Sequence, residues 1–198
     1  MGLPQWAGFS PAAAEDPLPV PFRAQAAAML RTMTLAHAKP PRSAAEQRLL
    51  DVALIDLWER RISFNQNLGL KVLTLGADSV EGPRVVFAMR PDLVGHAQSG
   101  RLHGGVISAT LDAAAGFALM VALGAKHADE SAAQVMHRFG RMGTIDLRVD
   151  YLRQGIGQRF VASAVVLRLG GRLASTQMRL VNEEDLLIAT GAASYVLS

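Results

Sequence analysis

The sequence contains no cysteine in its 198 residues, which excludes disulfides, thiol chemistry and cysteine-ligated metal sites. Its 20 Lys and Arg residues are scattered instead of clustering with aromatic residues, so the footprint of a nucleic-acid-binding protein is missing. The five histidines form no HxH or HExxH pattern, and we expect no metal and no cofactor. A G-x-S-x-G elbow is also absent, which disfavours a Ser-His-Asp hydrolase. A chain without cysteine suits a reducing compartment, and we expect a cytoplasmic location.

Half of the residues are hydrophobic and 19% are charged, which is typical of a globular domain with a sizeable core. The N-terminal run MGLPQWAGFSPAAAEDPLPVPF has no basic region and is broken by prolines, so it does not resemble a secretory signal. The stretch 104–123 is long enough to span a bilayer. It contains one acid and many small residues and lacks flanking aromatics, so we interpret it as a buried helix of a soluble core.

The first sixty or so residues predict a helical extension. Residues 1–20 are rich in Pro and Ala and indicate a flexible lead-in. The run 22–38 has helical composition and stops before two prolines. Ser43 stands three residues before Glu46, a capping-box pattern that predicts a second helix with an apolar face reaching Ile62. We therefore predict an extension over residues 1–66 and a second domain over 67–198.

Short β-rich runs predict the rest of the fold. Two runs separated by Gly and Pro, 70–82 and 83–91, indicate a hairpin, and four more strands follow the apolar helix, over 145–151, 159–169, 172–181 and 186–198. A polar, partly helical connection is expected over 124–143. Because helices and strands are segregated, we predict an α+β fold with an antiparallel sheet of about six strands wrapped around one long central helix.

The central helix carries one acid, Asp112, in an otherwise apolar run. An unpaired charge is costly to bury, which suggests a reactive group. Gly104 and Gly105 would begin this helix, where unpaired N–H groups can stabilise an oxyanion. Asp112 lies eight residues further on, roughly 12 Å along the axis. One carbonyl cannot contact both, so a shared site needs two subunits and predicts an obligate dimer. The alternative is that Asp112 pairs within the interior and the glycines only permit close packing.

The run LHGGVISATLDAAAG resembles the central motif of hotdog-fold acyl-CoA thioesterases of the phenylacetate-degradation (PaaI-type) group. The further runs GTIDLRVDYLR and NEEDLLIATGAASY resemble the YigI-type medium/long-chain acyl-CoA thioesterases within it. The resemblance covers about residue 60 to the C-terminus. It implies a hotdog fold, a homodimer that is frequently a tetramer, and a carboxylate at Asp112 that acts as general base or nucleophile. It also implies that the N–H of Gly104 from the other subunit polarises the thioester carbonyl.

Three further residues are carried over from the resemblance. His103 matches the motif histidine, which in the family supports the loop more than it performs acid–base chemistry. An Asn or Gln usually stands six or seven residues before it; Ala97 and His96 occupy those positions here, and His96 either substitutes or is a surface loop residue. Thr144 matches a Ser or Thr that holds the attacking water in related enzymes, although Thr is also a common strand residue.

Four arginines on or beside the predicted strands are candidates for the phosphates of coenzyme A, because guanidinium matches phosphate geometry. They are Arg148, Arg153, Arg168 and Arg172. Arg172, in a Gly-Gly-Arg turn, is the first choice. A solvated strand-face arginine is the common alternative for each.

The sequence favours an acyl-CoA thioesterase in which Asp112 activates water or attacks directly. A non-catalytic acyl-CoA-binding or sensing module on the same fold is the alternative from another class. A hotdog dehydratase or hydratase is a weaker third hypothesis. That chemistry needs a His–acid pair facing one tunnel, and the His-Gly-Gly…Asp arrangement does not obviously supply one.

Overall fold

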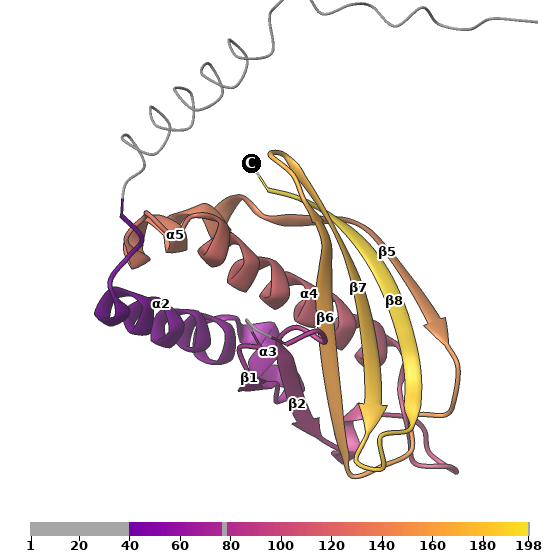
Figure 1. Cartoon of the computed structure of the whole chain (residues 1–198). Coiled ribbons are helices and arrows are strands. Elements are labelled where there is room, and N and C mark those ends of the chain that lie inside the picture. The colour runs from indigo at the N-terminus through magenta and orange to yellow at the C-terminus, as the bar shows by residue number, and fades with distance from the viewer. Residues whose placement is uncertain (1–39, 77–78, 198) are drawn as a thin grey trace, which may run out of the picture. The chain divides into compact units, whose positions relative to one another are not determined.

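The sheet and the long helix are both present in the computed structural model, which describes residues 40–76 and 79–197. The strands of the main sheet are β1 (Lys71–Thr74), β2 (Arg84–Ala88), β5 (Gly143–Tyr151), β6 (Arg159–Leu169), β7 (Leu173–Asn182) and β8 (Leu187–Val196). Their order across the sheet is β1-β2-β6-β7-β8-β5, and every neighbouring pair is antiparallel. The predicted α+β class and the six strands are confirmed. Figure 1 shows the sheet curling around one long helix.

That helix, α4 (Gly104–Lys126), is the centre of the core. Leu111, Phe117 and Leu119 are fully buried along it, and it contacts strands β5 to β8. By length and mean hydropathy of 1.9 it could cross a membrane. Burial against the sheet explains the large apolar residues of this helix, while the face that carries Asp112, Gly116 and Met120 is only partly buried.

The second predicted helix is present as three consecutive segments: α2 (Ala44–Asp56), a π-helical turn η1 (Leu57–Arg61) and α3 (Ser63–Leu68). Ser43 Oγ accepts the N–H of Glu46 at 3.2 Å, so half of the predicted capping box forms. The Glu46 carboxylate instead accepts the backbone N–H of Ala132 at 2.8 Å. It therefore joins α2 to the start of α5 (Ala132–Arg138). The helix predicted over 22–38 lies outside the described residues.

The π-helical turn accepts a hydrogen bond from a buried side chain of α3. Asn65 is 3% exposed and its Nδ2 donates to the carbonyl of Trp58 at 2.9 Å. A π-helical turn disrupts the regular helical hydrogen bonds, and a buried side-chain donor can satisfy a carbonyl that lacks its usual partner. Gly69 then ends α3 with a left-handed φ of 72°. These bonds fix the segment from Trp58 to Asn65 against α4, where Trp58 packs on Phe117 with ring centroids 5.2 Å apart.

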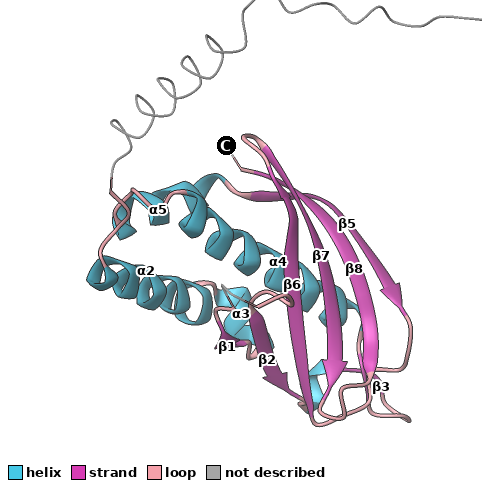
Figure 2. Ribbon diagram, in the orientation of Figure 1, coloured by secondary structure: helices cyan, strands magenta, loops and turns pink. Residues whose placement is uncertain are grey.

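The remaining elements are short. A 3₁₀ turn η2 (Pro91–Leu93) leads into a small hairpin of β3 (Val94–His96) and β4 (Arg101–Leu102), which the sequence did not predict (Figure 2). The predicted partly helical connection contains α5 and a 3₁₀ turn η3 (Phe139–Arg141). α5 begins with a complete capping box between Ser131 and Gln134.

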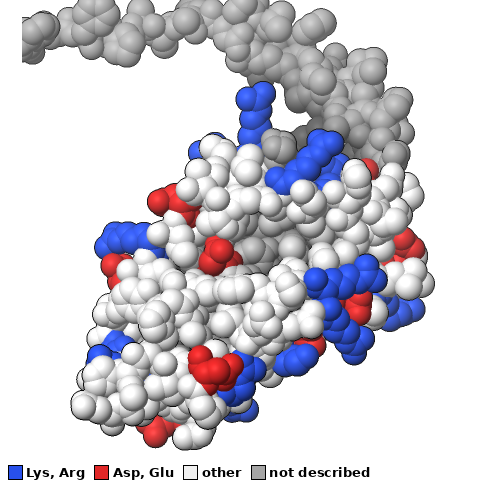
Figure 3. All heavy atoms as spheres, turned by 180° about the vertical axis from the view of Figure 1, so that it is seen from behind, with Lys and Arg blue, Asp and Glu red and all other residues white. Residues whose placement is uncertain are grey.

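Lys and Arg residues are interspersed with Asp and Glu on the face in Figure 3, in keeping with the scattered cations of the sequence.

Candidate active site

The carboxylate of Asp112, the ninth of the 23 residues of α4, is held by two hydroxyl groups. Thr144, at the start of β5, donates its Oγ1 proton to Asp112 Oδ1 at 2.9 Å. Tyr195, near the end of β8, approaches the same Oδ1 at 2.7 Å and the backbone carbonyl of Asp112 at 3.0 Å. Oδ2 receives no hydrogen bond from the chain over residues 40–76 and 79–197. One carboxylate oxygen is therefore fixed, and the other is available to a water molecule or a substrate.

Tyr195 is a site residue that the sequence analysis missed. Its side chain is 3% exposed. Burial, followed by the hydrogen bond to Asp112, raises the pKa of its phenol above the ordinary value. Tyr195 therefore remains protonated across the physiological range and continues to donate. Strand pairing explains how the two donors meet, because Thr144 of β5 lies directly opposite Tyr195 of β8.

A cavity of about 270 Å³ opens beside Asp112. Its lining is mainly apolar and comes from α4, from the segment 58–65 and from the chain around η3. The lining residues are Trp58, Ile62, Phe64, Asn65, Ala109, Asp112, Ala113, Gly116, Met120, Phe139, Met142, Gly143, Thr144 and Tyr195. One acid with two hydroxyls at the edge of an apolar cavity suits a reaction on a polar group that carries an apolar chain.

The N-terminus of α4 has the geometry of an oxyanion site. His103 is the N-cap, and its Nδ1 accepts the N–H of Gly105 at 2.9 Å, so the ring proton is on Nε2. The N–H of Gly104 has no acceptor in the part of the chain that the structure describes. Tyr151, another residue without a sequence signal, donates to the carbonyl of Gly104 at 3.1 Å. Of the two predicted glycines, Gly104 thus has the free donor, while Gly105 is used by the cap.

His96 lies in β3, and the hydrogen bond of its side chain is to Ser99 and not to Asp112. It is exposed, and its Nδ1 is 3.1 Å from Ser99 Oγ within the same hairpin. The hairpin is packed closely against the start of α4, since a Cβ on Gly95 would come within 2.4 Å of the His103 Cα. Within one chain, then, the predicted site residues form two groups. Asp112 with Thr144 is one, and His103 with the two glycines is the other; His96 joins neither directly.

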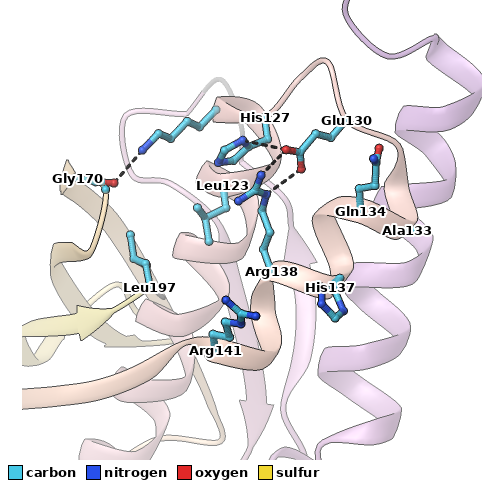
Figure 4. Close-up of a pocket in the computed structure, with 12 residues that line it drawn as sticks. Leu123, His127, Glu130, Ala133, Gln134, His137, Arg138, Arg141, Gly170 and Leu197 are labelled. Atoms are coloured by element: carbon cyan, nitrogen blue, oxygen red, sulfur yellow. Dashed lines mark hydrogen bonds and ion pairs between the residues drawn. The ribbon is translucent and has the colours of Figure 1, made fainter.

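A larger cavity of about 600 Å³ lies at the other end of α4, between α5 and the β6–β7 turn (Figure 4). Figure 4 shows Arg138 turned toward Glu130, which it contacts at 2.7 Å, and His127 also reaches Glu130 at 3.4 Å. Lys126, at this end of α4, is roughly 21 Å from Asp112 along the axis. The Glu130 carboxylate of this cavity is paired with Arg138, whereas Asp112 beside the smaller cavity has only hydroxyl partners, so the smaller cavity is the candidate site of chemistry.

The predicted phosphate-binding arginines differ in their surroundings. Arg148 pairs with Asp150 at 2.9 Å, and Arg153 donates to the carbonyl of Leu187 at 2.9 Å. Arg172 is exposed in the β6–β7 turn, directly after Gly170 and Gly171, which line the larger cavity. Its guanidinium makes no hydrogen bond or ion pair within residues 40–76 and 79–197.

Comparison with known proteins identifies the family of the chain. Residues 99–189 match the model of the thioesterase superfamily. The chain is 39% identical over 153 residues to the medium/long-chain acyl-CoA thioesterase YigI of Escherichia coli K12, covering 77% of this chain and 96% of that protein. YigI of Salmonella typhimurium matches at the same identity and coverage. A crystal structure from Shewanella oneidensis, described as related to the thioesterase superfamily, superposes with a TM-score of 0.72 at 31% identity, over 79% of this chain and all of that one. The chain belongs to the thioesterase superfamily and has its hotdog fold.

Proposed function

We propose that this protein is an acyl-CoA thioesterase that releases a free fatty acid and coenzyme A from medium- or long-chain acyl-CoA. The observation that carries the proposal is the Asp112 carboxylate, with Oδ1 fixed by Thr144 and Tyr195 and Oδ2 open to an apolar cavity. The activity of the relatives named YigI supports the same substrate class.

In this proposal Asp112 Oδ2 takes a proton from water while the water oxygen adds to the thioester carbon. The negative charge that develops on the carbonyl oxygen is stabilised by a backbone N–H. Collapse of the tetrahedral intermediate breaks the C–S bond, and the thiolate of coenzyme A leaves and takes the proton held by Asp112, which regenerates the carboxylate. Direct attack by the carboxylate, followed by hydrolysis of the anhydride, uses the same residues and remains the second route.

The N–H donor in this proposal is Gly104 of a second subunit. β5 is an edge strand that runs from Thr144, beside Asp112, to Tyr151, beside Gly104. Exposed edges pair readily with another chain. Antiparallel pairing of two β5 strands about a two-fold axis would place Thr144 of one chain near Tyr151 of the other. Asp112 would then face the free Gly104 N–H of its partner, which supports a homodimer as the catalytic unit. A tetramer of such dimers is compatible with it.

Other parts of the proposal rest on position alone. Arg172 is the best-placed candidate for the nucleotide phosphates, because its guanidinium is exposed and unpaired in the described chain, whereas Arg148 and Arg153 already have partners. In the dimer, His96 could orient a water from the hairpin beside the N-terminus of α4. Three further parts of the proposal come from the sequence. They are a cytoplasmic location, the absence of a cofactor, and an extension (1–66) that precedes the thioesterase domain (67–198).

The first test measures release of free thiol from octanoyl-CoA and palmitoyl-CoA by the wild type and by Asp112→Asn. We expect the variant to lose activity by about 10²- to 10⁴-fold, the usual contribution of a positioned base, while remaining a folded oligomer. A non-catalytic acyl-CoA-binding module is the alternative. It would be supported if neither protein released thiol and both bound acyl-CoA.

Mixed oligomers test the shared site. Gly104→Pro removes the proposed N–H at the first helical position, where proline is tolerated, so this variant should fold and be inactive. When Asp112→Asn and Gly104→Pro subunits are mixed after dissociation, half of the dimers are mixed and each has one intact site. We expect about a quarter of wild-type activity to return. If no activity returns in confirmed mixed dimers, the two groups do not act across subunits.

A further inference from the structure

The cavity beside Asp112 has a feature that bears on substrate choice. We propose that it holds the acyl chain, that the segment Trp58–Asn65 forms its outer wall, and that the missing side chain at Gly116 determines how long a chain fits. This inference rests on the proposed function and assigns the part of the site that selects the substrate.

The floor of the cavity is one face of α4. Asp112, Gly116 and Met120 follow one another at four-residue spacing, so they lie in a row on the same side of the helix. The row extends roughly 12 Å from the carboxylate. A Cβ built on Gly116 meets no atom within 4 Å. The floor is therefore hollowed one turn, roughly 6 Å, beyond Asp112, which lies past the end of a four-carbon acyl group and along the path of a longer one.

The outer wall comes from the extension that precedes the sheet. Trp58 is 1% exposed and is fixed by its contact with Phe117 and by the hydrogen bond from Asn65. Ile62 and Phe64 continue this wall, and Phe64 is 55% exposed although it lines the cavity. An aromatic ring this exposed at the edge of an apolar cavity gains from contact with an apolar ligand. The wall thus has a fixed inner part and an exposed rim.

The chemistry and size of the cavity indicate a straight aliphatic chain. Phe139 and Met142 add further apolar surface to the lining, and the polar lining residues Thr144 and Tyr195 both contact Asp112. With about 270 Å³ available, and roughly 30 Å³ for a group the size of water, the cavity accommodates about nine methylene-sized groups. Because position 116 is glycine, an acyl chain of medium length fits inside the cavity. A longer acyl chain would extend past Met120.

Gly116→Leu tests the floor. The substitution fills open space and replaces glycine inside a helix by a better helix former, so the fold should be retained. We expect kcat/KM for decanoyl-CoA and dodecanoyl-CoA to fall by about 10- to 100-fold, since a few buried methylenes are lost, while butyryl-CoA changes by less than about twofold. Ala125→Leu, which adds three side-chain carbons instead of four on an exposed part of the same helix, is the control and should leave the chain-length profile unchanged. An equal loss for all chain lengths, or no loss, refutes the role of Gly116.

Phe64→Ala tests the wall. We expect KM for dodecanoyl-CoA to rise several-fold and KM for butyryl-CoA to stay the same. Val52→Ala removes an exposed apolar side chain from α2 outside the cavity and is the matched control. Identical KM values for wild type and Phe64→Ala across the series would refute the wall.

A binding measurement separates this inference from the proposed activity. The chain has two tryptophans, and Trp6→Phe leaves Trp58, which lines the cavity, as the reporter. S-dodecyl-CoA, a thioether that cannot be hydrolysed, should shift its emission, and Gly116→Leu should weaken this binding but not that of S-butyl-CoA. If the shift follows chain length in a protein that hydrolyses no thioester, the inference stands and the thioesterase proposal fails. If thioesters are hydrolysed and Trp58 does not respond, the inference fails alone.

Discussion

Removal of the Tyr195 hydroxyl gives the sharpest test of how Asp112 is held. In Tyr195→Phe the ring remains buried, but the 2.7 Å bond to Asp112 Oδ1 and the 3.0 Å contact with its backbone carbonyl are lost. A hydrogen bond to a charged group is worth about 1.5–3 kcal/mol. Thr144 still donates to the same oxygen at 2.9 Å, so the carboxylate keeps one of its two supports.

If the full value of that bond acts in the transition state, kcat falls by about 10- to 100-fold, since 1.36 kcal/mol corresponds to a factor of ten. KM should change little, because Tyr195 holds the carboxylate and the apolar chain binds elsewhere in the cavity. Thiol release from octanoyl-CoA under saturating conditions measures kcat. Denaturant unfolding of the same samples measures the stability change, and size-exclusion chromatography confirms the oligomer.

A purely structural role would also lower stability, so the deciding measurement is made in the Asp112→Asn background. Tyr195 positions Asp112, and once that carboxylate is gone the loss of the hydroxyl should have no further effect on residual activity. Groups that act as a unit show this non-additivity. If Tyr195→Phe lowers the rate by the same factor with and without Asp112, then Tyr195 does not act through it and our reasoning is wrong.

Two further predictions concern stability. The pKa of Tyr195 is raised in the folded state, so above about pH 10 the unfolded chain loses its phenolic proton first, and unfolding becomes more favourable by up to about 1.4 kcal/mol per pH unit. The free energy of unfolding in urea should therefore depend less steeply on pH in Tyr195→Phe than in wild type. Equal slopes in the two proteins would contradict this. Arg42 Nη2 donates to the carbonyl of His127 at 2.8 Å and to that of Gly124 at the C-terminal end of α4, so Arg42→Ala should lower the unfolding free energy by about 1–3 kcal/mol. Arg60→Ala, which breaks an exposed ion pair, is the control and should cost less than about 1 kcal/mol; similar losses in both would exclude a capping role.

Local sequence patterns were sufficient for the six strands of the main sheet and for the long central helix. Alternating or β-rich runs between glycines predicted the six strands, and the apolar composition of residues 104–123 predicted a helix enclosed by the sheet. The lone acid in that helix led to Asp112, and the resemblance added Thr144, which the structure places 2.9 Å from it. These features depend on residues close together in sequence, where periodicity and composition carry the information.

What the sequence did not disclose depends on contacts between distant segments. Tyr195 is 83 residues from Asp112, and only the pairing of β5 with β8 brings its hydroxyl to the carboxylate. The π-helical turn is stabilised by one buried amide, Asn65, whose role cannot be read from its neighbours. The free N–H of Gly104, as opposed to Gly105, follows from where the His103 ring points. The sequence by itself determined the strands, the buried helix and its acid, because burial pattern and propensity are local. Tertiary structure alone decided which hydroxyls hold that acid and which side chains line its cavity, because those contacts join residues that only folding brings together.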